Sequence, residues 1–562
     1  MFKNYSLKNE TTWLQLLIVL AVIINLSGLF VPLMDPDAGV YATLSKNIVL
    51  RNNFSELFFQ GNDWLDKPHF PFWVTAVFFK CFGIHTWSYK LPGILFCFLG
   101  AIYTYLFTKK FYSTYTALWA TAILLTAEHI VISNNDVRAE AFLVALIMGA
   151  VYHFSILIYS KTNKKILFNL IIACFYSACA VMTKGIFTLI PIGFSIIGEC
   201  VMKKKWKELL YVRWLLAVLL ITIFITPELY SLWIQFDKHP EKIVFNRQGV
   251  SGIRFFLWDS QFGRFFNNGP IKGKGDPTFF LHTLLWAFLP WSVVMYIALW
   301  KKIKTAFQLK NSNHEEWFSF SGAIITLLVF SFSKFQLPYY TNIIFPFLSI
   351  LTAKFITIDI AKNGSKFIQI FQNIITIVIF IALILLQYFY APNLRSPVAI
   401  VFLIFIVMLM AVALHKLVVN GATKSLYRAC LAGMAFNLYF NTQFYPDLLH
   451  YQSGNEAAFF MNKNYPDVTV VCMNIYSPSA EFYLNSPLIK TDTSAILQSP
   501  NNFNKDVFFV REEELHFFER NNLRYQTIQS FKDFHVTGLT LPFINKKTRN
   551  GVLKNTYLIK LN

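Results

Sequence analysis

Long apolar stretches separated by short polar loops dominate this chain of 562 residues. A helix of about 20 apolar residues is long enough to cross the hydrocarbon core of a bilayer. The pattern therefore predicts about thirteen membrane-spanning helices. These predicted spans lie near 13–33, 88–107, 113–133, 140–160, 166–183, 185–202, 213–233, 279–300, 317–333, 338–358, 367–390, 397–415 and 425–444. The first stretch is long enough to span and lacks a small-residue cleavage site, so we expect an uncleaved first helix rather than a signal peptide.

Basic residues in the loops predict the orientation of these spans. With the N-terminus in the cytoplasm, the loops "MKKKWKELLYVR" and "WKKIKTAFQLK" lie on the inner side, as the positive-inside rule requires. An odd number of spans then places the three largest polar segments on the outer side: residues 34–87, residues 234–278 and the tail after about 445. Chemistry that needs water is expected in these segments.

Composition agrees with a membrane protein and excludes nucleic acid as a partner. Hydrophobic residues make up 55% of the chain and charged residues only 14%, whereas soluble domains average about 45–50% and about 25%. The net charge of +20 arises from lysines and arginines in loops between apolar stretches, which is a topological pattern. The seven cysteines form no CxxC motif and are interpreted as small core residues.

The last 117 residues, 446–562, differ in character from the membrane domain of residues 1–445. The runs "DVTVVCMNI", "DVFFVREEELHFFERN" and "TYLIKL" are typical of strands, the second followed by a charged helix, and "AEFYLNS" resembles a short helix. We therefore predict an α-helical polytopic membrane protein with a small C-terminal α/β domain on the periplasmic side. The segment "WLDKPHFPFWVTAVFFKCFG" at 64–83 is too short for a span and is predicted to be a helix in the outer interface.

Charged residues gather at the predicted outer ends of the helices, where each has a cost and is usually retained for function. A group of carboxylates and cations in this position suits a lipid-linked phosphate held beside a carboxylate base. Each residue taken alone is equally well explained as a solvated loop charge or an interface anchor. The charges concerned are Asp35, Asp37, Asp66, Lys67, Arg138, Glu140, Lys184, Asp259, Arg264 and Lys334.

Several motifs together resemble a known family. "MDPDAGVYATLSKNIVLRNNF" followed by "WLDKPHFPFWVTA" is similar to the first outer loop of bacterial aminoarabinose transferases and of the wider protein O-mannosyltransferase-like families, which are GT-C glycosyltransferases. "RAEAFLVAL", "MTKG", "WDSQFGRF" and "SFSKFQLPYYTNIIFPFL" continue the resemblance in the same order. It is colinear over roughly residues 13–350, and its order and spacing are more specific than any single motif.

The resemblance implies roles for individual residues. Asp37 precedes Tyr41 by four positions, as the catalytic aspartate of the family precedes its tyrosine, so Asp37 is the expected base. Lys67, assisted by Arg264 and Lys184, is expected to bind the carrier-lipid phosphate. The remaining expected substrate contacts are Tyr41, Asp66, Arg138, Glu140, Lys334, Tyr339 and Tyr340; for Tyr339 an aromatic anchor at headgroup level is an equally good interpretation.

The chain also departs from the family. Ala38 replaces the usual Glu after the catalytic aspartate, Asp66 replaces a Glu, and Gln261 stands where aminoarabinose transferases tend to have a His. Since that Glu and His are a plausible metal-ligand pair in the subfamily, no metal and no other cofactor is expected here.

Together these features predict an inverting, metal-independent glycosyltransferase at the periplasmic face of the inner membrane. It is expected to act as a monomer that moves a sugar from a polyprenyl phosphate to a glycolipid such as lipid A, or to a protein. A lipid-linked oligosaccharide polymerase or ligase remains an alternative. A lipid transporter or flippase is less favoured, because the charges cluster at the outer ends and no two related halves are visible.

Overall fold

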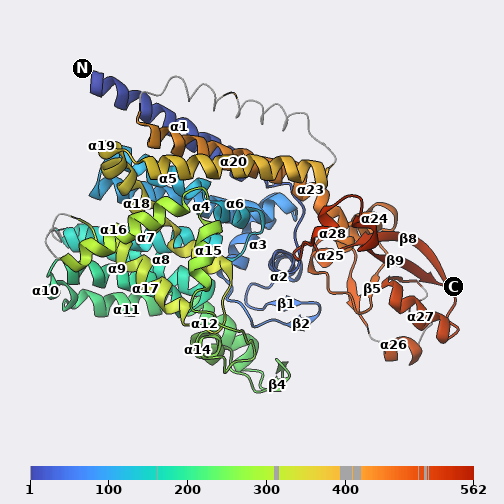
Figure 1. Ribbon diagram of the computed structural model, residues 1–562. Coiled ribbons are helices and arrows are strands. Elements are labelled where there is room, and N and C mark those ends of the chain that lie inside the picture. The colour runs from blue at the N-terminus through green and yellow to red at the C-terminus, as the bar shows by residue number, and fades with distance from the viewer. Residues whose placement is uncertain are drawn as a thin grey trace.

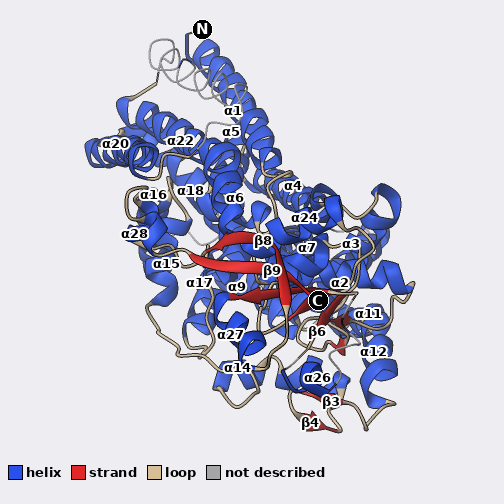
Figure 2. Cartoon of the chain, turned by 90° about the vertical axis from the view of Figure 1, so that its right-hand side faces the viewer, coloured by secondary structure: helices blue, strands red, loops and turns tan. Residues whose placement is uncertain are grey.

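The computed structural model describes residues 2–160, 163–308, 315–392, 408, 419–491, 493–498, 503 and 505–562. Within these ranges the chain folds as a large bundle of helices with a small mixed sheet near its C-terminal end (Figure 1). Figure 1 shows this sheet to the right of the helices, and Figure 2 looks onto that side, with the strands in front.

The bundle is built from apolar helices that follow one another through short connections. Its members are α1 (Phe2–Ser27), α4 (Thr86–Phe111), α5 (Thr114–Thr126), α6 (Glu128–Asn135), α7 (Ala139–Tyr159), α8 (Asn163–Lys184), α9 (Leu189–Met202), α11 (Arg213–Phe224), α12 (Thr226–Leu232), α15 (Phe279–Ala287), α16 (Ser292–Gln308), α17 (Phe318–Ser331), α18 (Phe345–Phe355), α20 (Lys366–Phe389) and α22 (Gly421–Tyr439). Every predicted span within the described ranges overlaps one or two of these helices. The predicted span at 397–415 lies outside the described residues.

Six helices of the described residues are long and apolar enough to cross a membrane singly, and two bent pairs raise this number to eight. The predicted number of about thirteen stays a prediction, since several helices at predicted spans, such as α9 and α17, are shorter than a full bilayer crossing.

Three predicted continuous spans are broken in the structure. α5 and α6 meet at 52° around Ala127, and α11 and α12 meet at 41° just before Pro227. α15 and α16 are separated by a turn that contains Pro290. Proline lacks the amide donor that an unbroken helix needs, which explains the latter two breaks. At the first break the amide of Glu128 donates to the carbonyl oxygen of Leu289 at 3.0 Å, so the freed donor is satisfied inside the protein.

Two loops between the bundle helices carry structure of their own. The first holds α2 (Asp37–Arg51), β1 (Phe58–Phe59), β2 (Asn62–Asp63) and α3 (Phe70–Phe82). The second holds β3 (Ile243–Val244), β4 (Arg247–Gln248), α13 (Gly252–Arg254) and α14 (Phe262–Phe266). α3 begins directly after the "DKPH" sequence and has only 13 residues, so the helix predicted at 64–83 is present and short.

The C-terminal segment forms a five-stranded sheet in the order β6-β5-β7-β9-β8. β5 lies parallel to β6 and β7, whereas β9 lies antiparallel to β7 and β8. Its elements are α23 (Tyr445–Leu448), α24 (Ser453–Asn464), β5 (Val470–Cys472), α25 (Pro478–Tyr483), β6 (Leu488–Lys490), α26 (Thr493–Gln498), β7 (Val507–Arg511), α27 (Glu512–Arg520), β8 (Tyr525–Asp533), α28 (Leu541–Ile544) and β9 (Lys554–Leu561). Three of the strands and α25 occur at the runs that the sequence pattern indicated.

The three large polar segments meet one another. The Gln235 amide nitrogen donates to the Leu57 carbonyl at 2.8 Å and to the Asp63 carboxylate at 2.9 Å, which joins the first loop to the second. α2 packs against α25 of the C-terminal domain, and Figure 1 shows α2, β1 and β2 between that domain and the bundle. This junction contains the residues described next.

Candidate active site

Asp37 lies in the first turn of α2, where the positive end of the helix dipole favours a carboxylate. Its side chain is 45% exposed and forms an ion pair with Nη1 of Arg138. Arg138 directly precedes α7, so the ion pair connects the first loop to the bundle. The ion pair therefore fixes the orientation of the carboxylate, while its exposed part remains accessible to an incoming group. A general base requires both.

Arg138 is itself fixed by Asp136 and Tyr339. Its Nε and Nη2 atoms donate to Oδ2 of Asp136 at 2.9 and 2.6 Å. The guanidinium also lies 4.0 Å from the centre of the Tyr339 ring, and the Tyr339 hydroxyl donates to the same Asp136 oxygen at 2.6 Å. Sequence reasoning missed Asp136, although a carboxylate two positions before Arg138 was a signal for such a partner. The structure gives Tyr339 a contact with Arg138.

Asp66, Lys67 and Arg264 form a second cluster. Lys67 Nζ lies 2.8 Å from one carboxylate oxygen of Asp66, and Arg264 forms an ion pair with the other. One carboxylate is thus shared by two cations from two different loops. Among the described residues the buried Nε of Arg264 has no hydrogen-bond acceptor, so this cluster retains a donor that a further anion can use.

Burial and charge act against each other in this cluster. Burial alone would raise the pKa of Asp66, but the Lys67 and Arg264 cations hold it below its ordinary value. Burial lowers the pKa of Lys67, and the Asp66 carboxylate opposes that change. A second anion would favour the charged form of Lys67 further, as expected for a phosphate site.

Lys184 and Tyr340 lie beside this cluster. Lys184, the last residue of α8, forms an ion pair with Glu140, and its ammonium lies 3.8 Å from the centre of the Tyr340 ring. The amide nitrogen of Gln261 donates to the Lys184 carbonyl at 3.1 Å. Gly185 follows with φ of +93°, a conformation that favours glycine and explains the TKG turn.

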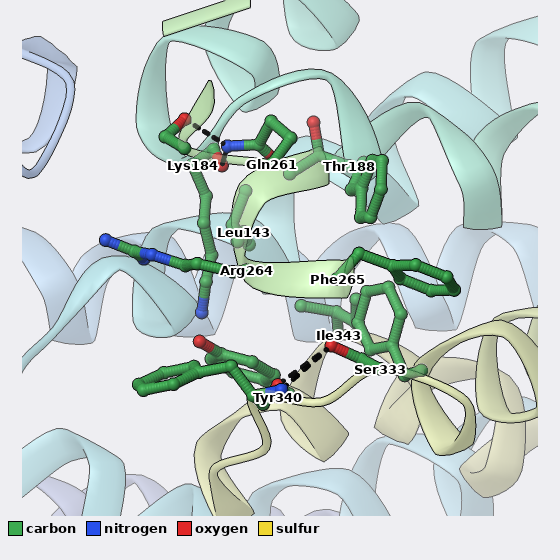
Figure 3. A pocket seen from close by; sticks show the side chains of 13 residues that line it. Leu143, Lys184, Thr188, Gln261, Arg264, Phe265, Ser333, Tyr340 and Ile343 are labelled. Atoms are coloured by element: carbon green, nitrogen blue, oxygen red, sulfur yellow. Dashed lines mark hydrogen bonds between the residues drawn. The ribbon is translucent and has the colours of Figure 1, made fainter. Parts of the chain in front are cut away.

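A small pocket of about 70 Å³ lies at these residues (Figure 3). Lys184 and Arg264 are the charged residues among its lining, and Figure 3 shows the Lys184 side chain extending towards Tyr340. The other side chains include Leu143, Phe187, Phe265, Phe330, Phe335 and Ile343. A pocket lined by two cations and several apolar side chains suits an amphiphile that has an anionic head and a hydrocarbon chain.

The predicted site residues Tyr41 and Lys334 do not line the pocket. Tyr41 is buried and packs edge-on against Phe72 of α3, with ring centres 5.0 Å apart. Burial, followed by the charges of Asp37 and Asp66, raises its pKa well above the ordinary value. Lys334 is exposed and does not line the pocket; its backbone amide donates to the Phe265 carbonyl at 3.1 Å. The structure therefore brings the other predicted residues together and leaves the Lys334 side chain outside.

Asp66 and Gln261 do not fit a cation site. Both oxygens of Asp66 are engaged by Lys67 and Arg264, and Gln261 presents its amide nitrogen, a donor, to the Lys184 carbonyl. Within the described ranges no group of three potential ligands from His, Cys, Asp and Glu is present. No step of the chemistry below is therefore routed through a metal.

His69 and Glu228 anchor the loop that carries Lys67. The backbone amide of His69 donates to Glu228 Oε2 at 3.0 Å, and its Nδ1 lies 2.9 Å from Oε1. Both side chains are buried. Sequence reasoning missed this contact, because Glu228 belongs to α12, far along the chain.

Glu228→Ala is expected to lower the free energy of unfolding by about 1–3 kcal/mol, because the buried His69 donor loses its acceptor. Glu228→Gln keeps an acceptor oxygen and should lower the free energy of unfolding by less. Thermal unfolding midpoints of the purified proteins in detergent measure the difference. Equal unfolding midpoints for the two variants would show that a side-chain acceptor at position 228 does not stabilise the protein.

Asp35 points away from Asp37 and towards the C-terminal domain. Its carboxylate accepts hydrogen bonds from the Ser477 hydroxyl at 2.7 Å, the Ser479 amide at 2.8 Å and the Ser479 hydroxyl at 2.8 Å. Burial raises the pKa of Asp35 to about 6, although these donors favour the charged form; Asp136 adds to the rise.

This pKa predicts that ionised Asp35 reduces stability. An unfolded aspartate titrates near about 3.9, so the folded chain binds this proton more tightly. The cost of ionisation is fully present above pH 6 and disappears as the pH falls towards about 4. The unfolding midpoint of the wild type should therefore rise relative to that of Asp35→Asn between pH 7 and pH 5, measured in one detergent. A difference that does not change with pH would contradict the assignment.

The chain is similar to known proteins both in sequence and in structure. Residues 66–231 match the sequence profile of the family described as dolichyl-phosphate-mannose-protein mannosyltransferase. An undecaprenyl phosphate-alpha-4-amino-4-deoxy-L-arabinose arabinosyl transferase of Wigglesworthia glossinidia brevipalpis is 24% identical over 62% of this chain and 58% of that protein. An uncharacterised protein of Aquifex aeolicus is 24% identical over 63% of this chain and 65% of its own length. The matched region thus spans less than two thirds of these relatives.

The crystal structure of ArnT from Cupriavidus metallidurans bound to undecaprenyl phosphate superposes with a TM-score of 0.74 at 17% identity. The alignment covers 97% of this chain and 98% of that one, and the apo structure of the same protein gives 0.72. This likeness shows a shared fold and confirms the predicted class, an α-helical polytopic membrane protein. Together with the sequence matches, it confirms the resemblance to GT-C glycosyltransferases of the aminoarabinose transferase type.

Proposed function

Because this chain shares the sequence features and the fold of GT-C glycosyltransferases of the aminoarabinose transferase type, we propose that it transfers a monosaccharide from a polyprenyl phosphate to an acceptor hydroxyl. The observation that carries the proposal is the position of the half-exposed Asp37 carboxylate beside a pocket lined by two cations and several apolar side chains. Burial lowers the pKa of Lys67, and the Asp37 carboxylate is among the neighbouring charges that oppose this change.

The donor lipid binds with its phosphate at the cations and its hydrocarbon chain in the apolar pocket. Arg264 offers its buried Nε, and Lys184 extends into the same space. Lys67 contributes a third charge from the first loop. Because the leaving group is a phosphate already paired with cations, no nucleotide-binding segment is needed.

Transfer follows from the positions of Asp37 and the cations. The acceptor oxygen attacks the anomeric carbon while Asp37 takes its proton. The bond from that carbon to the phosphate oxygen breaks, and its electron pair stays on the phosphate. Lys67, Arg264 and Lys184 stabilise the added negative charge. A single displacement of this kind inverts the anomeric configuration.

The acceptor approaches from the C-terminal domain, which covers the first loop. Tyr476 of this domain is 51% exposed and packs edge-on against Phe59, with ring centres 6.3 Å apart. Burial, followed by the charges of Asp35 and Asp37, raises its pKa to about 12, so its hydroxyl remains protonated and available as a donor. We place this face in the periplasm and take the acceptor to be a glycolipid such as lipid A, or a protein, bound by a monomer.

Lipid intermediates of a strain that lacks the protein test the donor class. The proposal predicts that a polyprenyl monophosphate carrying one sugar accumulates, as measured by mass spectrometry of extracted lipids. Accumulation of a lipid diphosphate oligosaccharide would instead identify a polymerase or ligase. An unchanged lipid profile together with altered lipid distribution across the membrane would indicate a transporter.

A further inference from the structure

Asp35 is held by a compact group of C-terminal residues, here called the Asp35–serine cluster and formed by Asp35, Ser477 and Ser479. All three hydrogen bonds to its carboxylate come from these two serines, at 2.7–2.8 Å. A carboxylate with three donors is well satisfied and is poorly placed to take a proton from a substrate. Its neighbour Asp37 points towards Arg138 and remains 45% exposed.

The chain just before Asp35 is fixed by the same domain. The Asp35 amide donates to Gln452 Oε1 at 2.9 Å, and the Gln452 amide nitrogen donates to the Leu33 carbonyl at 3.1 Å and to the Ser479 hydroxyl at 2.9 Å. Asn455 donates to the same Leu33 carbonyl at 3.1 Å. Gln452 therefore links the segment that leads into α2 to Ser479, one of the two serines that hold Asp35.

α2 itself is bound to α25. The Thr43 hydroxyl donates to the Pro478 carbonyl at 3.0 Å. Lys46 Nζ donates to three carbonyls at the end of α25, those of Glu481, Phe482 and Leu484, at 2.7–3.0 Å. A cation at this position satisfies carbonyls that a helix end leaves unpaired.

Gly39 allows these two backbones to approach. A Cβ atom at this position would meet Oδ1 of Asp35 first, and it would lie 2.6 Å from the Ser479 amide nitrogen and 2.9 Å from Pro478 Cβ. Real Cβ atoms do not come so near to other heavy atoms, so any larger residue would displace the Asp35 carboxylate and force α2 and the Ser479 segment apart.

We propose that Asp35 is a positioning residue, through which Ser477 and Ser479 of the C-terminal domain fix the start of α2 and so the direction of Asp37. Only Pro36 separates the two aspartates, so a displacement of Asp35 moves the first turn of α2. The inference rests on the proposed function and deepens it, because it makes the C-terminal domain part of the catalytic arrangement. Asp35 and Ser477 also line a cavity of about 490 Å³, whose other lining residues, apart from Pro36, belong to the C-terminal domain.

Three variants of the full chain test this role: Asp35→Ala, the double variant Ser477→Ala/Ser479→Ala, and Asp35→Asn, which keeps an acceptor for the Ser479 amide. Transfer is measured with purified protein in lipid nanodiscs at varied concentrations of polyprenyl-phosphate sugar. The first two should each lower kcat by about 10-fold and leave the donor KM unchanged, since Asp35→Ala removes all three hydrogen bonds of the cluster and the double serine variant removes the two from the hydroxyls. Asp35→Asn should recover most of the rate, and combining Asp35→Ala with the serine changes should add nothing.

Two activity results would overturn the inference. If Asp35→Ala abolishes transfer while the serine variant is normal, Asp35 acts directly on the substrate. If Asp35→Ala is normal, the cluster has no positioning role.

Backbone hydrogen exchange gives a readout that does not need activity. Exchange of the amides at the start of α2 should quicken in Asp35→Ala and in the serine variant, while exchange in α3 stays the same. Gly39→Ala should have the same effect, because its Cβ atom would displace both the Asp35 carboxylate and the Ser479 backbone. Unchanged exchange in all three would contradict the inference, even if no tested sugar proves to be a donor and the proposed function itself fails.

Discussion

Asp37→Asn is expected to lower the rate of sugar transfer by about 100- to 10,000-fold, the usual contribution of a general base. Asparagine has a side chain of the same size but cannot take the proton from the hydroxyl of the sugar acceptor. The loss should appear in kcat, because Asp37 lies beside the pocket rather than among its lining residues. Steady-state rates of the purified variant in nanodiscs measure it.

Asp276→Asn is the matched control for this change. Asp276 is an exposed carboxylate of the second loop whose oxygen caps a local turn at Thr278, and asparagine can make the same contact. Its rate should equal that of the wild type. Near-normal turnover by Asp37→Asn, with unchanged binding of donor, would remove Asp37 from the role of base.

Lys67→Ala is expected to lower kcat/KM for the donor lipid by about 100- to 1,000-fold, as loss of one group that stabilises a developing anion does. The change removes one of the two cations that share Asp66 and leaves that carboxylate paired with Arg264 alone. The site then repels a phosphate more strongly. Titration of the donor at a fixed acceptor concentration measures the loss.

Lys272→Ala provides the control for this second change. Lys272 is an exposed lysine of the loop that also carries Arg264, so its removal changes the net charge equally without altering the pocket. It should leave kcat/KM unchanged at physiological salt. An equal kcat/KM for the donor lipid in Lys67→Ala and in the wild type would exclude a contact between Lys67 and the donor phosphate.

The bundle was predictable because hydrophobic length carries a direct physical signal. Every described span overlaps a helix for this reason, and Pro227 and Pro290 explain two of the breaks. The break at Ala127 was not predictable, since the local sequence contains neither proline nor glycine. The amide freed there donates to the carbonyl of Leu289, which is distant in the chain.

Within the site, spacing and charge predicted which residues lie near one another better than they predicted how these residues pair. The motif order brought Asp37, Lys67, Lys184 and Arg264 forward, and the structure places them together. Nothing in the sequence indicated that Asp66 would bridge two cations or that the Lys334 side chain would lie outside the pocket. Pairings of this kind depend on the packing of separate loops.

The residues that sequence reasoning missed are those that act through long-range contacts. Ser477 and Ser479 lie more than 400 positions after Asp35, and Glu228 lies 159 positions after His69. Serines at the start of a short helix and a glutamate in an apolar helix have no periodic pattern that would reveal a partner. The role of the C-terminal domain therefore became visible only in three dimensions.

The most direct test of the central claim is transfer by the purified protein in vesicles, with labelled sugar supplied as polyprenyl monophosphate, polyprenyl diphosphate or nucleotide conjugates and a panel of glycolipid and protein acceptors. The account predicts labelled acceptor and released polyprenyl phosphate with a monophosphate donor only, and no product with Asp37→Asn. Transfer from a diphosphate or nucleotide donor, or equal product from the Asp37 variant, would contradict it.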